Sequence, residues 1–408
     1  MFYSGVMRIA FTEQQERLRA ELRDYFAHLM TDERRVALRS AGGEYGGGDV
    51  YREITRTLGK DGWLALGWPE EYGGQNRPVL DQLIFTDEAA IAGVPVPFLT
   101  VNTVGPAIMA GGTDEQRARF LPGIAAGEIH FSIGYSEPEA GTDLASLRTR
   151  AVRDGDEFVI TGQKMWTSLI EYADYVWLAA RTDPEAARHR GLSILIVPTD
   201  ADGFSWTKVH TVAGPGTSAT YYDGVRVPAD AVVGELDQGW RLITNQLNHE
   251  RVALTSAAPL QDSLRQVTEW ARQTRLPDGA RVIDAEWVQL HLAHVHAHAE
   301  YLKLRNWRIA WAADRAHLTG DGDDQAYGPA GASATKVFGT EYATEAYRLL
   351  MEVLGSAAIV RSGSPGAVLA GRIERLHRSS LILTFGGGTN EIQRDIIAGT
   401  ALGLPVTR

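Results

Sequence analysis

Residues 245–254 read NQLNHERVAL and contain a single acid, Glu250. If this segment is helical, Leu247, Glu250 and Leu254 lie at positions i, i+3 and i+7, so a carboxylate falls within an apolar stripe that faces a core or a pocket. Desolvation there disfavours the charged form of an acid, so Glu250 has a partner, for which Arg251 is available, or a chemical task. Taken alone, the segment favours a paired acid at a subunit interface.

The composition is that of an ordinary globular protein of two or three domains. The chain has 408 residues, of which 44% are hydrophobic, and its net charge of −11 argues against a non-specific nucleic-acid binder or an anionic-membrane binder. The lack of cysteine excludes disulfides, thiolate catalysis and cysteine-ligated metals. No secretory pattern follows either possible start, Met1 or Met7, and no apolar run approaches the ~18 residues of a membrane span. We therefore expect a cytoplasmic protein that acts on small molecules.

The first part of the chain is predicted to be helical. Residues 11–30 fit an amphipathic helix with Thr12 as N-cap. Its apolar face is expected to consist of Leu18, Leu22, Tyr25 and Leu29. Further helices, bounded by glycine and proline, are expected at 51–66, 79–92, 103–110 and 114–121.

A small β domain and a second set of helices are predicted to follow. The β-type runs are 157–160, 175–180, 192–197, 204–210 and 220–227, with a hairpin turn at Asp154-Gly155. Helical periods return from residue 238 through 250, at 283–318, at 333–354 and up to Ala398. Residues 319–331 are expected to form an irregular loop. The predicted domains are 7–125, 126–236 and 237–408.

Two loops of the β region carry groups that suit a flat polar ring. Residues 135–147 (YSEPEAGTDLASL) gather hydroxyls, backbone amides and Gly141, which could contact a ring edge or a phosphate. Residues 162–168 (GQKMWTS) place the indole of Trp166 beside Ser168 at the end of a strand, where the indole could pack on a ring and the hydroxyl could bond it. Each segment by itself is explained more simply by an ordinary turn or a core tryptophan.

Two further segments have alternative explanations. His291, His294 and His298 share one helix face, but no acid at helical spacing completes a metal site, so a surface or a subunit interface is the better explanation. Residues 383–397 (LTFGGGTNEIQRDII) contain three glycines, which permit close backbone approach to a ligand or form a hinge between helices.

In this order, the segments resemble the acyl-CoA dehydrogenase family over nearly the whole chain. YSEPEAGTDLASL is similar to the family's T-E-P-x-A-G-S-D segment, GQKMWTS to G-x-K-x-W-I-T, and GGGTNEIQR to E-G-T-x-x-I-Q-R. The resemblance implies a mainly α protein: an N-terminal helical domain, a middle β-barrel domain and a C-terminal four-helix bundle, with FAD between the last two. The FAD-binding residues that it implies are Tyr135, Ser136, Gly141, Thr142, Trp166, Ser168, Arg275, Glu352, Gly355, Thr389 and Glu391.

The chain departs from the family pattern at three places. Gly387 stands where many members carry the catalytic Glu, whereas NHER at 248–251 matches the L-x-x-E-R helix on which a minority place the base. Arg275 is a shifted stand-in for the Arg of E-R-x-x-F-G, and Glu352 stands where members have Gln. The last two departures alter residues that, by the resemblance, contact FAD across subunits.

The resemblance implies α,β-dehydrogenation of an acyl-CoA, with Glu250 as the base. The backbone N–H of Gly387 would bind the thioester oxygen, with Arg251 beside the substrate. A closer similarity to actinobacterial enzymes of steroid (cholesterol) side-chain degradation implies an α2β2 heterotetramer with a related subunit, and an electron acceptor such as an electron-transfer flavoprotein. A flavin oxidase or monooxygenase of the same fold, a non-catalytic partner subunit and a metal-dependent hydrolase remain alternatives.

Overall fold

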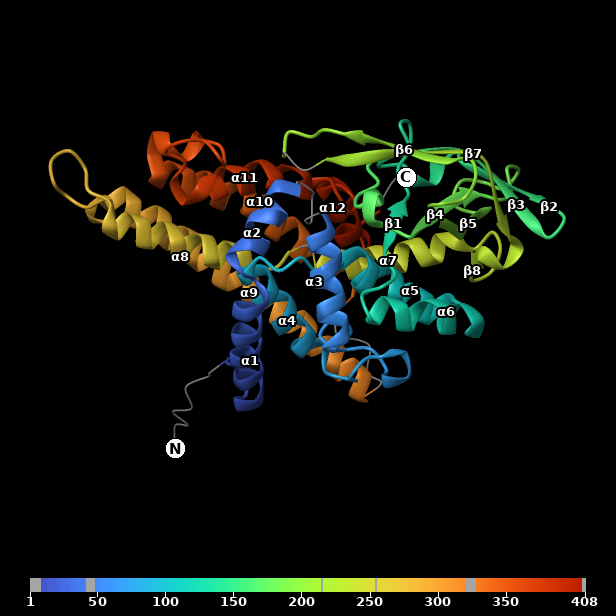
Figure 1. The fold of residues 1–408 in the computed structure, drawn as a ribbon, viewed down its shortest axis with the longest axis horizontal. Helices are drawn as coiled ribbons and strands as arrows, with labels where there is room; N and C mark the ends of the chain where they lie inside the picture. Colours follow the sequence, from blue (N-terminus) through green and yellow to red (C-terminus); the bar gives the residue numbers. More distant parts are fainter. Residues whose placement is uncertain (1–8, 42–47, 214–215, 254, 320–327, 406–408) are drawn as a thin grey trace.

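The computed structural model describes residues 9–41, 48–213, 216–253, 255–319 and 328–405, without the side chains of 39–41, 247–253 and 316–319. Figure 1 shows the β-sheet at one end of the molecule and long C-terminal helices that extend to the other end, with the N-terminal helices beneath them. The predicted order of helical, β and helical regions is confirmed. No helix in these described ranges is long and apolar enough to cross a membrane.

The N-terminal helices follow the predicted pattern with small differences. They are α1 (Glu13–Leu29), α2 (Asp32–Ala41), α3 (Gly48–Lys60), α4 (Val79–Ala92), α5 (Gly105–Gly111) and α6 (Asp114–Ala125). Thr12 caps α1 in a capping box with Gln15, as predicted. The buried face of α1 differs from the prediction in one residue, because Phe26 is buried in place of Tyr25. The helix expected over 51–66 ends at Lys60, because Gly62 adopts a left-handed conformation (φ +80°). The short helix α2 was not predicted.

A π-helical turn, Thr100–Val104, precedes α5. Gly105 follows it, where a Cβ atom would lie 2.2 Å from the ring of Trp68, so only glycine fits against this indole. The turn packs on β1 and on α7 (Gly239–Ala253). It therefore joins the N-terminal helices to the two parts of the chain that carry the predicted site.

The strands form one mixed sheet. They are β1 (Phe131–Gly134), β2 (Arg150–Asp154), β3 (Glu157–Lys164), β4 (Tyr175–Arg181), β5 (Leu192–Pro198), β6 (Phe204–Val209), β7 (Thr217–Pro228) and β8 (Val232–Val233). Their order is β6-β7-β3-β2-β4-β5-β8, and β1 pairs in parallel with β4. The predicted hairpin is confirmed, because Asp154 pairs with Glu157 around Gly155. The strands β1, β2 and β8 were not among the predicted runs.

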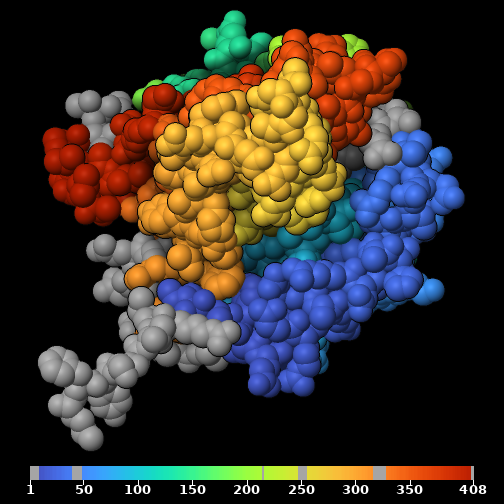
Figure 2. Space-filling model, turned by 90° about the vertical axis from the view of Figure 1, so that its left-hand side faces the viewer, coloured from blue at the N-terminus to red at the C-terminus, as the bar shows by residue number. Residues whose placement is uncertain are grey.

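The C-terminal region is an extended set of helices. They are α7, α8 (Ala258–Gln273), α9 (Glu286–Thr319), α10 (Pro329–Leu354), α11 (Arg372–Ser380) and α12 (Asn390–Thr400). Figure 2 shows α8 and α9, in gold and orange, standing in front of the N-terminal helices. Most of the irregular loop predicted at 319–331 lies outside the described residues, but Thr319 belongs to α9, and Pro329 starts α10 at a position where proline is tolerated. The helices α8 and α11 were not predicted.

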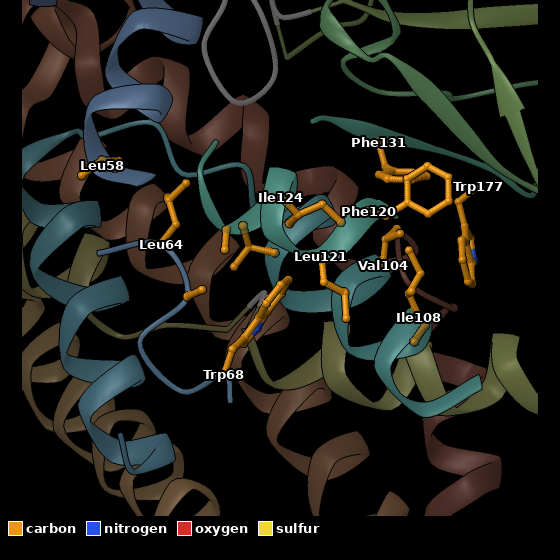
Figure 3. Packing of buried hydrophobic residues seen from close by; sticks show 14 of the residues in the cluster. Leu58, Leu64, Trp68, Val104, Ile108, Phe120, Leu121, Ile124, Phe131 and Trp177 are labelled. Carbon is orange, nitrogen blue, oxygen red and sulfur yellow. The ribbon is translucent and has the colours of Figure 1, made fainter. Parts of the chain in front are cut away.

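A continuous apolar core joins the N-terminal helices to the sheet. Figure 3 shows Leu121 and Ile124 of α6 packed between Trp68 and Phe131. The same core includes Trp177 of β4 and Ile243 of α7. The first half of α7 is thereby held against the sheet, and position 250 follows in the second half of the same helix.

Candidate active site

Two segments predicted to contact a flat ring lie side by side. The backbone N–H of Met165 donates to the carbonyl of Ser136 at 2.8 Å, and the ammonium of Lys164 donates to the carbonyl of Tyr135 at 3.0 Å. The 135–147 and 162–168 segments therefore meet at the end of β3. The tertiary structure brings Ser136, Trp166 and Ser168 to the same edge of the sheet.

A buried ion pair supports this edge from below. Lys164 Nζ lies 2.8 Å from Glu137 Oε1, and both side chains are buried. Burial lowers the pKa of the Lys164 ammonium to about 8, against the opposing effect of Glu137. Burial disfavours the charged form of Glu137 as well, but Lys164 and the backbone N–H groups of Arg148 and Thr149 outweigh it and hold the pKa of this carboxyl below its usual value. The pair fixes the two ring-facing segments relative to each other.

Trp166 has a conformation that packing alone does not explain. Its backbone is in the left-handed region (φ +65°), and its side chain is 56% exposed. Leu169 is also left-handed (φ +62°), and the carbonyl of Ser168 between them accepts a hydrogen bond from Ser132 Oγ at 2.7 Å. Non-glycine residues with positive φ are uncommon and cluster at functional sites. The simpler explanation, a core tryptophan, is therefore wrong: the indole is presented at the surface of this chain.

Gly141 and Thr142 lie in the exposed part of the first segment. A Cβ atom at Gly141 would meet nothing within 4 Å, so the glycine is not required by packing inside this chain. The neighbouring Asp143 pairs with Arg188 at 2.7 Å. This part of the loop therefore has room for a ligand.

The glycine segment 386–388 forms a turn that leads into α12. Gly387 and Gly388 have φ values of +67° and +88°, and Thr389 caps α12 by accepting from the N–H of Ile392 at 3.3 Å. Lys336 of α10 donates from its ammonium to the carbonyl of Gly388 at 2.7 Å and to Asn390 Oδ1 at 2.9 Å.

The first turn of α12 is exposed to an approaching ligand. Glu391 lies there, and hydrogen bonds from its own backbone N–H and from the Thr389 hydroxyl lower the pKa of its carboxyl. The same turn offers amide donors beside Thr389 to a ligand.

Glu250 and Arg251 lie in α7, but their side chains are outside the described residues. One turn earlier, the buried Gln246 accepts a hydrogen bond at Oε1 from the hydroxyl of Tyr135. Trp177 Nε1 donates to the same hydroxyl at 3.0 Å. The side chain of Tyr135 thus points into the protein toward α7, and its backbone carbonyl faces the edge where the two segments meet.

Three residues of the predicted cofactor site lie elsewhere. Arg275 follows α8 in the hairpin at the far end of the molecule from the sheet (Figure 1), where its guanidinium donates to the carbonyl of Gly279 at 2.7 Å. Glu352, near the end of α10, pairs with His291 at 2.7 Å and with Arg348. Gly355 ends α10 with a φ of +64°. The fold of a single chain does not bring these residues to the other site residues.

The histidine face of α9 packs through a row of ring contacts against α10. The rings of His294 and His298 lie 4.3 Å apart, and His298 stacks on Tyr342 at 4.5 Å. Within the described ranges, no three histidine, aspartate or glutamate side chains are grouped so that they could hold a metal ion. The contacts of these histidines are therefore those of a packed helix pair.

Three supporting groups were missed by sequence reasoning. The Lys164–Glu137 pair lay within the quoted motifs, but its members are 27 residues apart, so neither motif alone indicated it. Lys336 is buried in α10 next to Ser333 and Thr340, where the sequence has no apolar stripe that would mark it as unusual. Gln246 carried no local signal, because its partner Tyr135 is 111 residues away.

Comparison with known proteins follows the same three-part order. Residues 12–128, 132–225 and 237–402 match the families described as the N-terminal, middle and C-terminal domains of acyl-CoA dehydrogenase. Acyl-CoA dehydrogenase FadE26 of Mycobacterium tuberculosis is 68% identical over 402 residues, which cover 98% of this chain and 99% of the relative. Acyl-CoA dehydrogenase FadE29 of the same organism is 44% identical, with the same coverage.

Solved structures agree in fold along the whole chain. A chain of the ChsE4-ChsE5 complex from Mycobacterium tuberculosis is 66% identical, with a TM-score of 0.90 and coverage of 98% of this chain and 100% of that chain. A chain of the Tcur3481-Tcur3483 steroid ACAD is 49% identical, with the same TM-score and coverage. Because domain matches, close relatives and site geometry agree, the chain belongs to the acyl-CoA dehydrogenase family and is an enzyme of this class.

Proposed function

We propose that this enzyme binds FAD and dehydrogenates the α,β-bond of a bulky steroid side-chain acyl-CoA, with Glu250 as the base. The observation that carries the substrate class is the whole-chain likeness to a structure described as a steroid ACAD and to a chain of the ChsE4-ChsE5 complex. Both structures are named after two different chains. For this protein we likewise propose an α2β2 assembly with a related subunit, and an electron-transfer flavoprotein as electron acceptor.

The described residues fit a flavin. Trp166 presents an exposed indole at the edge where Ser136 and Ser168 lie, which suits one face and the polar rim of a flat ring. The glycine turn before α12 and the amides beside Thr389 suit the remainder of the cofactor. In this proposal Gly141, Thr142 and Glu391 border the site, while Arg275, Glu352 and Gly355 could reach only a cofactor held by another subunit.

The protein's own groups account for the proton transfer. Position 250 lies one turn after Gln246 in α7, on the helix face that meets the Tyr135 loop. A carboxylate there would accept the α-proton, while the backbone N–H of Gly387 would donate to the developing enolate oxygen. Arg251 would lie beside the acyl-CoA. When bound, FAD supplies the acceptor for the hydride that leaves the β-carbon.

The substrate class is tested by anaerobic titration of the purified enzyme, co-expressed with a related subunit, with octanoyl-CoA, isovaleryl-CoA and a steroid side-chain acyl-CoA. Bleaching of the flavin by the steroid thioester, with weak bleaching by the other two, supports the proposal. Equal bleaching by octanoyl-CoA contradicts the steroid assignment. Stoichiometric peroxide release in air would instead identify a flavin oxidase.

The base is tested by Glu250→Gln, which keeps the shape of the side chain and removes its basicity. Flavin reduction should slow by about 10²- to 10⁴-fold, whereas FAD content and acyl-CoA binding should be retained, because the change removes only a group that accepts a proton in the transition state. Glu157→Gln, at an exposed ion pair of β3, is the matched control. A Glu250→Gln enzyme within about threefold of the parent would exclude this residue as a general base.

A further inference from the structure

Tyr135 belongs to two parts of the site at once. Its carbonyl is bonded by Lys164 at the ring-binding edge, and the next carbonyl, of Ser136, is bonded by Met165. Its side chain turns inward, where the hydroxyl accepts from Trp177 Nε1 and donates to Gln246. Tyr135 therefore links this loop directly to α7.

The first half of α7 is held in place by packing. Ile243 is part of the core that joins the N-terminal helices to the sheet. Leu242 packs so closely on Gly111 that a Cβ atom there would lie 2.7 Å from its Cδ2. Gln246 follows as the last described buried residue of the helix, with 1% exposure. Position 250 is one further turn along, so Gln246 is the described anchor nearest to it.

A glutamine at position 246 is unfavourable if its role is packing alone. Its Nε2 is buried and has no hydrogen-bond partner in the described part of the chain. A buried amide with half of its hydrogen-bonding capacity unmet is less favourable than an apolar side chain of similar size. Packing alone therefore gives no reason for glutamine at this position. The polar atom that Gln246 does use is its side-chain oxygen, which accepts from the Tyr135 hydroxyl.

We propose that the Tyr135–Gln246 hydrogen bond positions the reacting groups, by holding the turn of α7 that carries Glu250 at a set distance from the ring-binding loop. The inference rests on the roles proposed above for Glu250 and FAD. Proton and hydride leave adjacent carbons of one substrate, so base and ring must be aligned together. A displacement of about 1 Å can slow such a reaction by about 10²-fold. Both residues are positioning residues, because neither is argued to touch the reacting atoms.

The kinetic test compares Gln246→Leu, Tyr135→Phe and the double variant, each purified with its partner subunit and measured per bound FAD. With the steroid side-chain acyl-CoA, both single variants should reduce flavin about 10- to 100-fold more slowly at unchanged FAD content. The double variant should be no slower than the slower single one, because the two residues act as a pair. Tyr222→Phe, a buried tyrosine of β7 whose hydroxyl lies 3.4 Å from Thr220, is the control and should keep the parent rate.

Stability separates positioning from a structural role. Gln246→Leu should melt near the parent temperature while it slows the reaction, because removal of the unpartnered buried Nε2 offsets the loss of the acceptor for the Tyr135 hydroxyl. A loss of rate that only accompanies a loss of folded or FAD-loaded protein contradicts the proposal. Additive effects in the double variant contradict it as well.

Hydrogen exchange of the FAD-free protein gives a readout that needs no turnover. Peptides that span α7 should exchange faster in Tyr135→Phe, whereas peptides of β4 and β5 should be unchanged. Equal protection of α7 in the variant and the parent would overturn the inference. If Glu250→Gln is inactive while Gln246→Leu and Tyr135→Phe remain within about twofold of the parent, this inference fails and the proposed base stands. If Glu250→Gln is active, the proposed base fails, and the exchange result still decides whether the tether exists.

Discussion

Gly387 stands where many family members carry a glutamate, and its backbone conformation disfavours any side chain. Its φ of +67° lies in the left-handed region, which costs an L-residue about 1–2 kcal/mol. Gly387→Ala should therefore lower the melting temperature. It should also slow flavin reduction, because relaxation of the strain would turn the N–H away from the thioester oxygen.

The matched control for this prediction is Gly363→Ala, which has a φ of +82° and open space around its Cβ position. It should lower the melting temperature similarly and leave flavin reduction unchanged. Equal rates in Gly387→Ala and the parent would show that the N–H does not bind the oxygen. The same strain would apply to Gly387→Glu, so a glutamate there should restore little activity to Glu250→Gln.

Asp87 of α4 introduces a pH dependence of stability near the end of α7. Its carboxylate accepts from Ser256 Oγ at 2.6 Å, and burial raises the pKa of this carboxyl to about 6 against that hydrogen bond. A raised pKa means that the folded state binds more protons than the unfolded state between pH 4 and 6, so stability falls as pH rises through this window. Above it, the full penalty for burying the charge remains.

Asp87→Asn should consequently stabilise the protein at pH 8 by up to about 3 kcal/mol, and little at pH 4. Asparagine retains an acceptor for Ser256, so this hydrogen bond is not lost. Melting temperatures across pH 4–8 measure the effect, with the exposed Asp200→Asn as control. A difference between variant and parent that is constant with pH would contradict the assignment of this titration to Asp87.

At the scale of elements, a buried amine of α10 is one of the groups that join this helix to the start of α12. Lys336 Nζ bonds the carbonyl of Gly388 and Asn390 Oδ1, and so holds the glycine turn at the start of α12. Lys336→Met keeps the side-chain volume and leaves both oxygens without this donor. The free energy of unfolding should fall by about 1.5–3 kcal/mol for each charged hydrogen bond that is lost. FAD occupancy should fall with it, because the turn is proposed to contact the cofactor.

Thermal melting and the absorbance ratio of bound FAD to protein measure both effects. Lys208→Met, at an exposed pair with Glu171, removes an amine without touching the turn and should change neither quantity. Full FAD occupancy in Lys336→Met at the parent's stability would show that α12 does not depend on this contact.

At the scale of the molecule, α9 carries an unusual stripe of exposed apolar side chains. Trp287, Leu290, Tyr301, Leu304 and Trp311 are 38–62% exposed. Their spacings of three, eleven, three and seven residues place them on one face with a heptad period, as in helices that pack against a partner helix. Such a stripe on a 34-residue helix indicates an interface.

We expect the related subunit of the proposed assembly to cover this face. Trp287→Glu should dissociate the co-expressed complex, because large aromatic residues contribute about 2 kcal/mol or more at the centre of an interface. Light scattering after size exclusion measures the mass, and Trp206→Glu on the exposed strand β6 is the control. An intact complex in Trp287→Glu would place the partner elsewhere. Arg275 could contact a cofactor only in such an assembly, because the turn that follows α8 lies at the opposite end of the molecule from the sheet.

The sequence by itself determined the order of the three regions, many of the helices and the family. These features depend on local signals: the Thr12 capping box, the Asp154-Gly155 turn and ordered motifs around Trp166 and Thr389. Local periodicity was less informative for α2, α8 and α11, and for the short strands β1 and β8, whose pairing depends on distant partners.

Only the tertiary structure decided how the site is held together. The Lys336–Gly388 contact joins residues 52 positions apart, and the Tyr135–Gln246 bond joins residues 111 positions apart. It also showed that Trp166 is exposed in a strained conformation, and that Arg275 and Glu352 lie away from the other site residues. A sequence pattern encodes the period and the ends of an element, whereas a contact between elements depends on how their buried faces pack, which no local pattern contains.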